Sequence, residues 1–198
     1  MSDEHDKGKR DFLVGVTAGM GTVATGAVLV PFVASWGPSE RAKAAGAPVE
    51  VDLAKIKPGE MKVYEWRGKP VWVLRRTREM LAELDKLTTS GRLVDPNSEA
   101  PQQPEYCKNK YRSQKDEFLV VVGICTHLGC SPTFRPDEHA PDLGADWLGG
   151  YFCPCHGSRF DLAARVFKGS PAPTNLVVPP HAYVSDTVVK IGVDPEVA

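Results

Sequence analysis

An uncharged apolar run close to the N-terminus restricts how this chain can fold more than any other feature. No Asp, Glu, Lys, Arg or His occurs from Phe12 to Ser39, and residues 12–36 are largely apolar. An α-helix crosses about 30 Å of hydrocarbon in about 20 residues, so this run is long enough to span a membrane. A cleaved signal peptide is the alternative, but its apolar region has only about 7–15 residues. We therefore expect a retained transmembrane anchor at residues 12–36.

The composition on either side of the anchor divides the rest of the chain into three parts. Residues 1–11 form a polar N-terminus, residues 37–48 a linker of small and polar residues, and residues 49–198 a separate head. The stretch from Lys9 to Leu13, KRDFL, resembles a twin-arginine export signal with Lys in the first arginine position. This resemblance makes export of the head by that route a hypothesis.

The head is predicted to be an antiparallel β structure. Alternating or clustered β-forming residues at 61–66 and 69–74 flank Arg67-Gly68, which predicts a hairpin. A run of β-branched residues at 118–124 predicts a buried strand. Thr77 can cap a short helix, and the following residues would place apolar side chains on one face of it. Further predictions are a long loop at 91–116, closing strands at 176–178, 182–184 and 187–191, and helix-face residues Met80, Leu81, Leu84 and Leu87.

The charge balance excludes one class of partner. The chain has 24 Lys and Arg against 25 Asp and Glu, which gives a formal net charge of −1. A nucleic-acid-binding domain needs a basic face. We therefore expect no nucleic-acid partner.

Two short segments of the head concentrate ligands that soft and borderline metals prefer. The strand ending at Ile124 continues into CTHLGC at residues 125–130, and CPCHGS follows at residues 153–158. Each segment has a Cys and a His close together and a second Cys, which indicates a metal site. Two Cys and two His suit a structural zinc ion. Zinc-finger spacings, however, group Cys with Cys and His with His, and a zinc site would leave two thiols unused.

This pair of motifs resembles the loops of Rieske iron–sulfur proteins. In those proteins two Cys bind one iron of a 2Fe-2S cluster and two His bind the other. The resemblance implies that Cys125 and Cys153 bind the inner iron and that His127 and His156 bind the outer iron. It also implies the fold, a Rieske-type antiparallel β-sandwich with a cluster-binding subdomain.

The resemblance further implies a disulfide between Cys130 and Cys155 that joins the two loops. Such a bridge needs an oxidising compartment, in agreement with an exported head. Of the five cysteines this leaves Cys107, which we interpret as having no role. We also interpret His139, in the long segment 128–152, and His181 as surface residues.

Three further positions correspond to parts of the Rieske site that surround the cluster. Ser158 matches a serine that donates a hydrogen bond to the cluster in high-potential relatives. Phe160 stands where those relatives often have a tyrosine whose hydroxyl donates to a ligand sulfur. Because such a hydrogen bond stabilises the reduced form, the missing donor predicts a lower potential. Residues 169–173, GSPAP, resemble the proline loop that covers the cluster.

Histidine ligands also favour a particular substrate. Rieske centres have potentials of about −150 to +300 mV, against about −400 mV for four-cysteine ferredoxins. An imidazole bound to iron keeps an N–H whose acidity depends on the charge of the metal centre. A centre of this kind therefore suits a substrate that gives up an electron together with a proton, as a quinol does.

Anchor, linker and head together resemble the iron–sulfur subunit of a bacterial cytochrome bc complex. The resemblance implies oxidation of ubiquinol, with His156 and His127 as the catalytic residues. It implies that Leu128 and His156 dock at the quinol site of a cytochrome b subunit, and that the head swings on the linker to reduce a c-type cytochrome. The complex would be dimeric and lie in the inner membrane, with the head on the periplasmic side.

Three other functions are compatible with a Rieske cluster. The principal alternative is the small subunit of an exported molybdenum oxidase such as arsenite oxidase, which shares export and cluster. A soluble Rieske ferredoxin should lack the membrane segment. An oxygenase component needs a second domain for mononuclear iron, for which the chain has no room.

Overall fold

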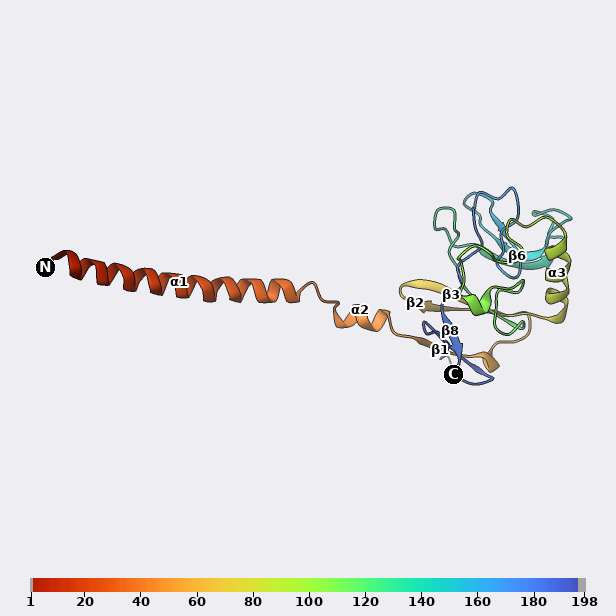
Figure 1. Ribbon diagram of the computed structural model, residues 1–198. Coiled ribbons are helices and arrows are strands. Elements are labelled where there is room, and N and C mark those ends of the chain that lie inside the picture. Colours follow the sequence, from red (N-terminus) through yellow and green to blue (C-terminus); the bar gives the residue numbers. More distant parts are fainter. Residues whose placement is uncertain (1, 196–198) are drawn as a thin grey trace. The chain divides into compact units, whose positions relative to one another are not determined.

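The computed structural model describes residues 2–195 (Figure 1). The chain forms two compact units that divide between Ala44 and Ala45. In the first unit α1 (Ser2–Ala34) is one continuous helix, and its stretch Asp6–Ala34 is long enough to cross a membrane and contains an 18-residue window with a mean hydropathy of 1.8. The helix begins before the predicted anchor, which started at Phe12.

A short second helix, α2 (Glu40–Ala45), lies within the predicted linker. The Oγ of Ser39 accepts a hydrogen bond of 3.2 Å from the N–H of Ala42, as an N-cap residue does. Residues 37–39 and 46–48 on either side of it are not helical.

The second unit, the head, is built from three antiparallel sheets in the part of the chain that the structure describes. Their strands, in spatial order, are β1 (Val49–Asp52), β9 (Val188–Ile191) and β8 (His181–Tyr183); β2 (Met61–Trp66), β3 (Lys69–Arg75) and β4 (Phe118–Val122); and β5 (Thr133–Glu138), β6 (Leu148–Phe152) and β7 (Arg159–Phe160). The predicted antiparallel β head is therefore confirmed.

The sheet β2-β3-β4 is the central layer of the head. Successive side chains of a strand point to opposite faces, so this sheet contributes to a core on each side. One face packs on the sheet β1-β9-β8 and the other packs on β6 and β7. The two sets are Val71, Val73, Phe118, Val120 and Val122 toward the first sheet, and Trp72, Leu74, Leu119 and Val121 toward β6 and β7. Burial of each such side chain stabilises the fold by about 1.5–3 kcal/mol.

The predicted helix is α3 (Arg78–Thr89), and Thr77 is its N-cap. The Thr77 side chain accepts a hydrogen bond of 3.3 Å from the N–H of Met80. Leu84 and Leu87 are buried, while Met80 packs half-buried against the core. The predicted apolar face is confirmed.

The sheet β5-β6-β7 carries the metal-binding motifs, and it depends on a glycine. Tyr151 of β6 pairs with Phe160 of β7. A Cβ atom at the neighbouring Gly150 would lie 2.0 Å from the carbonyl oxygen of Phe160, so only glycine allows these strands to approach.

The structure confirms most of the predicted elements and corrects one. The hairpin, the strand from Phe118, β8 and β9 lie where they were expected, and the segment 91–116 is a loop with one short 3-10 helix, η2 (Glu105–Cys107). The predicted strand 176–178 is wrong. Its backbone hydrogen bonds go to three different segments, so no strand forms. The N–H of Leu176 donates to the carbonyl of Ala164, the carbonyl of Val177 accepts from the N–H of Val122, and the N–H of Val178 donates to the carbonyl of Gln102.

Candidate metal centre

The first metal-binding loop, residues 125–130, follows β4 and is closed by two backbone hydrogen bonds. The N–H of Cys125 donates to the carbonyl of Cys130 at 2.8 Å, and the N–H of Gly129 donates to the carbonyl of Cys125 at 3.0 Å. Gly129 has φ +84°, in the left-handed region that favours glycine. This pattern turns the chain sharply after the buried Cys125.

The second metal-binding loop, residues 153–158, follows β6 and repeats the same backbone pattern. The N–H of Cys153 donates to the carbonyl of Ser158 at 2.8 Å, and the N–H of Gly157 donates to the carbonyl of Cys153 at 2.9 Å. Gly157 has φ +78°. Each loop therefore begins with a buried cysteine and has a left-handed glycine four residues later.

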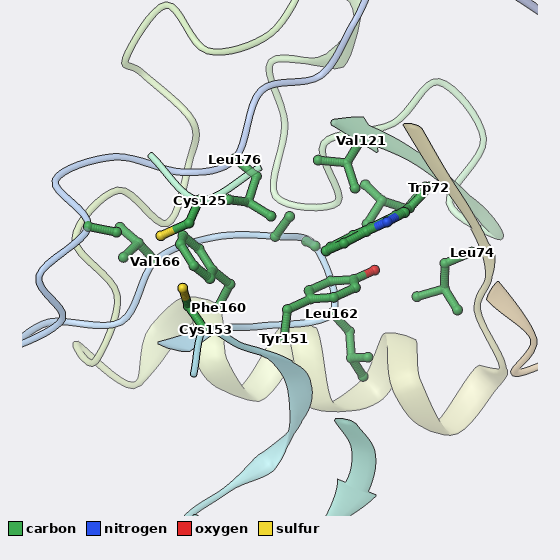
Figure 2. Packing of buried hydrophobic residues seen from close by; sticks show 14 of the residues in the cluster. Trp72, Leu74, Val121, Cys125, Tyr151, Cys153, Phe160, Leu162, Val166 and Leu176 are labelled. Carbon is green, nitrogen blue, oxygen red and sulfur yellow. The ribbon is translucent and has the colours of Figure 1, made fainter. Parts of the chain in front are cut away.

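The two cysteines that begin the loops lie inside the head. Cys125 is 3 % exposed and Cys153 2 % exposed, and both belong to the core cluster that contains Phe160. Figure 2 shows the two sulfur atoms facing each other beside the Phe160 ring. Burial raises the pKa of the Cys153 thiol, and the neighbouring Cys125 raises it to a smaller extent. A cation between the two sulfurs would supply the charge that stabilises them as thiolates.

The two histidines of the motifs lie at the surface end of the same loops. The rings of His127 and His156 are 4.8 Å apart, centroid to centroid, and their planes meet at 86°. His127 is half-buried and His156 is exposed. The donor set therefore has two thiols on the inside and two imidazoles on the outside.

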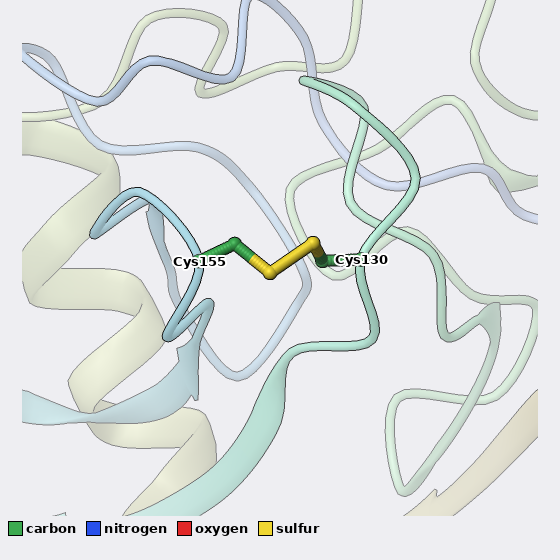
Figure 3. Close-up of a disulfide and its surroundings, with 2 residues drawn as sticks. All are labelled: Cys130 and Cys155. Carbon is green, nitrogen blue, oxygen red and sulfur yellow. A yellow bond between two sulfur atoms is a disulfide. The ribbon is translucent and has the colours of Figure 1, made fainter.

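A disulfide between Cys130 and Cys155 joins the loops, as predicted (Figure 3). The sulfur atoms of these two residues and of Cys153 lie within 4.8 Å of one another. This group is not a three-thiolate metal site, because two of its sulfurs are bonded to each other. The disulfide instead holds one loop against the other beside Cys153.

The predicted proline loop, residues 169–173, is hydrogen-bonded to the second metal-binding loop. The N–H of Ala172 donates to the Oγ of Ser158 at 3.1 Å, and the N–H of Arg159 donates to the Oγ of Ser170 at 3.1 Å. Ser158 is fully buried. Since its oxygen already accepts, the proton of its hydroxyl is left to donate elsewhere.

Two contacts around the loops were not predicted from the sequence. The Thr126 hydroxyl donates a hydrogen bond of 2.7 Å to the carbonyl of Thr174, which joins the first loop to the segment after the proline loop. The guanidinium of Arg112 is fully buried and donates to the carbonyls of Leu176 at 2.6 Å and Ala164 at 3.2 Å. Burial lowers its pKa to about 10. Arg112 lies in a polar loop, and no local pattern around it indicates that it is buried.

The interpretation of His181 as a surface residue is wrong. His181 is 1 % exposed, and its Nδ1 lies 2.9 Å from the carbonyl of Pro179, which makes Nδ1–H the donor. Its Nε2 lies 4.0 Å from the Sγ of Cys107, which is also buried. The two meet because η2 packs against β8, a contact between residues far apart in sequence. His139 is exposed, as expected.

Comparisons with known proteins agree with this geometry. Residues 106–181 match the Rieske [2Fe-2S] domain, and residues 1–39 match the family described as "Ubiquitinol-cytochrome C reductase Fe-S subunit TAT signal". The ubiquinol-cytochrome c reductase iron-sulfur subunit of Allochromatium vinosum is 61% identical over 96% of this chain and 90% of its own length. The chain belongs to the family of ubiquinol-cytochrome c reductase iron-sulfur subunits.

Two further relatives extend the comparison. The corresponding subunit of Blastochloris viridis is 40% identical over 96% of both chains. A chain of a hyperthermophilic respiratory Complex III is 25% identical, with a TM-score of 0.50 over 89% of this chain and 97% of that chain. The protein is therefore a membrane-anchored Rieske subunit that carries a 2Fe-2S cluster, and the buried thiols and surface imidazoles suit such a cluster.

Proposed function

We propose that the protein oxidises ubiquinol within a cytochrome bc complex and that the paired loops form its reactive end. The observation that carries the proposal is the ordering of the donors, with the Cys125 and Cys153 thiols buried and the His127 and His156 rings at the surface. These four residues would hold the 2Fe-2S cluster, which supplies one-electron redox chemistry when bound.

The residues around the cluster position would have separate roles. The exposed His156 would accept the quinol proton at the ring nitrogen that is not bound to iron, and His127 would complete the same surface. Leu128, which is 71% exposed, would enter an apolar pocket of the cytochrome b subunit. The Ser158 hydroxyl would donate its free proton toward the cluster sulfurs.

The remaining partners and the location belong to the same proposal. A c-type cytochrome would receive the electron, the complex would be dimeric, and the head would lie on the periplasmic side of the inner membrane. The match of residues 1–39 supports export by the twin-arginine route, with Lys9 in the first arginine position. Reporter fusions expressed in strains that lack either export pathway would test this route.

The linker would let the head move between its two partners. Its short helix α2 lies between non-helical residues on both sides, which leaves two points where the chain can bend. Deleting residues 46–48 should slow turnover and leave the cluster spectrum intact. Normal turnover in that deletion would contradict the movement.

Leu128 gives the sharpest test of the docking end. Leu128→Ala removes apolar surface that is worth about 1.5–3 kcal/mol when buried, so the complex should need more quinol for half-maximal rate while the cluster potential stays unchanged. Val184→Ala is the matched control, since Val184 is 64% exposed on the segment after β8. Equal kinetics in the two variants would contradict docking through Leu128.

Membership of the reductase family favours this function over the molybdenum oxidase alternative. The distinguishing measurement is the composition of the purified complex. Haem-containing partners are expected, and co-purified molybdenum would contradict the proposal.

A further inference from the structure

A small cavity lies beside the second metal-binding loop and has no role in the proposed function. Its volume is about 310 Å³, at the lower end of the range for small-molecule sites. Four separate segments of the head meet there. They contribute Arg92 after α3, Asp146 and Trp147 before β6, Arg159 at the start of β7, and Phe167 and Lys168 before the proline loop.

The walls of the cavity carry an excess of positive charge. Three cationic side chains and one carboxylate line it, which leaves two positive charges. The Arg92 guanidinium binds Asp146, with Nη2 2.6 Å from Oδ2 and 2.9 Å from the backbone carbonyl oxygen. The side chains of Arg159 and Lys168 form no hydrogen bond or ion pair within residues 2–195. Two cations are thus available to a ligand.

The floor of the cavity is apolar and aromatic. Trp147 and Phe167 are buried, and their ring centroids are 6.2 Å apart. The Arg92 guanidinium carbon lies 5.2 Å from the centre of the Phe167 ring, a cation–π distance. The two ring planes meet at 40°, so the cavity has a tilted apolar floor below a cationic rim.

The cavity is held in shape by bonds between the segments that line it. The N–H of Lys168 donates to the carbonyl of Arg92 at 2.8 Å, and the N–H of Phe167 donates to the carbonyl of Arg159 at 3.0 Å. The Trp147 Nε1–H donates to the carbonyl of Arg135 at 3.2 Å. A ligand would not have to order these backbone segments, which lowers the entropic cost of binding.

We propose that this cavity binds a small organic anion, a phosphate monoester or carboxylate attached to a small apolar group. The fork of Arg159 matches two oxygens of such an anion, and Lys168 adds a second charge. The apolar group would lie against Trp147 and Phe167. The proposal uses no cluster ligand and does not depend on the proposed function.

The test uses 4-fluorophenyl phosphate as the probe. Fluorine NMR measures its binding to the full-length protein in detergent. Wild-type protein should broaden the probe signal in a saturable manner. Arg159→Gln/Lys168→Gln should weaken binding about tenfold or more, because it removes both charge-assisted hydrogen-bond donors from the cavity. Lys57→Gln/Lys69→Gln is the matched control: both lysines are exposed, and the variant removes the same charge outside the cavity. It should bind as wild type does.

Two further probes separate the contributions of charge and apolar surface. Inorganic phosphate carries the charge alone and 4-fluorobenzyl alcohol the ring alone, so each should bind more weakly than the ester. Equal weakening in the two double variants, or binding of inorganic phosphate as tight as that of the ester, would indicate an adventitious ion only and overturn the proposal. An unchanged visible spectrum of the cluster would show that the cavity variant is folded.

Discussion

The backbone N–H of Ala172 in the proline loop donates to the Oγ of Ser158 in the second metal-binding loop, at 3.1 Å. This bond fixes the direction of the serine hydroxyl. Because the oxygen is occupied by a donor, the hydroxyl proton points away from Ala172 and is free to meet the sulfurs of the cluster. The proline loop therefore orients the residue that we expect to tune the cluster.

Ser158→Ala should lower the midpoint potential of the cluster. One hydrogen bond contributes about 0.5–1.5 kcal/mol, which for one electron corresponds to roughly 20–65 mV. A redox titration followed by electron paramagnetic resonance measures the shift. Ser170→Ala is the control, since Ser170 Oγ also bonds this loop but accepts from the backbone N–H of Arg159. A potential as low in the control as in Ser158→Ala would assign the shift to loss of loop structure.

Phe160→Tyr should raise the potential by a similar amount. The Phe160 ring is fully buried beside the Cys125 and Cys153 sulfurs, so a para hydroxyl there can donate to a ligand sulfur (Figure 2). Tyr151, its partner across β6 and β7, does not supply this bond. Its hydroxyl points away from both sulfurs and has no hydrogen-bond partner within the described residues.

Tyr151→Phe is therefore the matched control for Phe160→Tyr. It removes a hydroxyl from the same pair of hydrogen-bonded strands, and it should leave the potential unchanged. An unchanged or lower potential in Phe160→Tyr would contradict the assignment of Phe160 as the missing donor.

Local sequence patterns predicted the helix and strands that interactions between neighbouring residues stabilise. They failed where a contact links segments that are distant in sequence. The N-cap at Thr77 and the hairpin of β2 and β3 follow from neighbouring residues, and both were predicted. Strand β5 was not, because its sequence TFRPDE has no apolar alternation and contains Pro136. The burial of Arg112 and His181 depends on carbonyls and thiols more than 50 residues away, which no window of sequence contains.

The buried His181 should make stability depend on pH. Burial lowers the pKa of His181 below its ordinary value of 6.5, although the hydrogen bond to the Pro179 carbonyl and then Asp194 oppose the shift; the other groups that face the ring are Cys107, Tyr106 and Tyr183. Below pH 6.5 the unfolded chain takes up a proton at this residue before the folded protein does. The stabilising contribution is therefore present above about pH 6.5 and is lost as the pH falls, by at most about 1.4 kcal/mol per pH unit.

Urea unfolding of the full-length protein at pH 7.5 and 5.5 measures this dependence. His181→Gln should lose less free energy of unfolding between the two pH values than wild type does. His139→Gln, which changes an exposed histidine, should behave as wild type. The same slope in all three proteins would show that His181 does not carry the dependence.

Removing the disulfide should loosen the metal-binding loops. Cys130 and Cys155 are 25 positions apart, and a bridge that closes a loop of this size stabilises a fold by about 3–4 kcal/mol. Cys130→Ala/Cys155→Ala should therefore lower the urea midpoint and release iron faster, as measured by loss of the visible spectrum in a chelator. Cys107→Ala removes a buried thiol away from the loops, and it should lose some stability but release iron at the wild-type rate. If the double variant retains iron as long as wild type, the loops are held by their backbone hydrogen bonds alone and the disulfide does not restrain the centre.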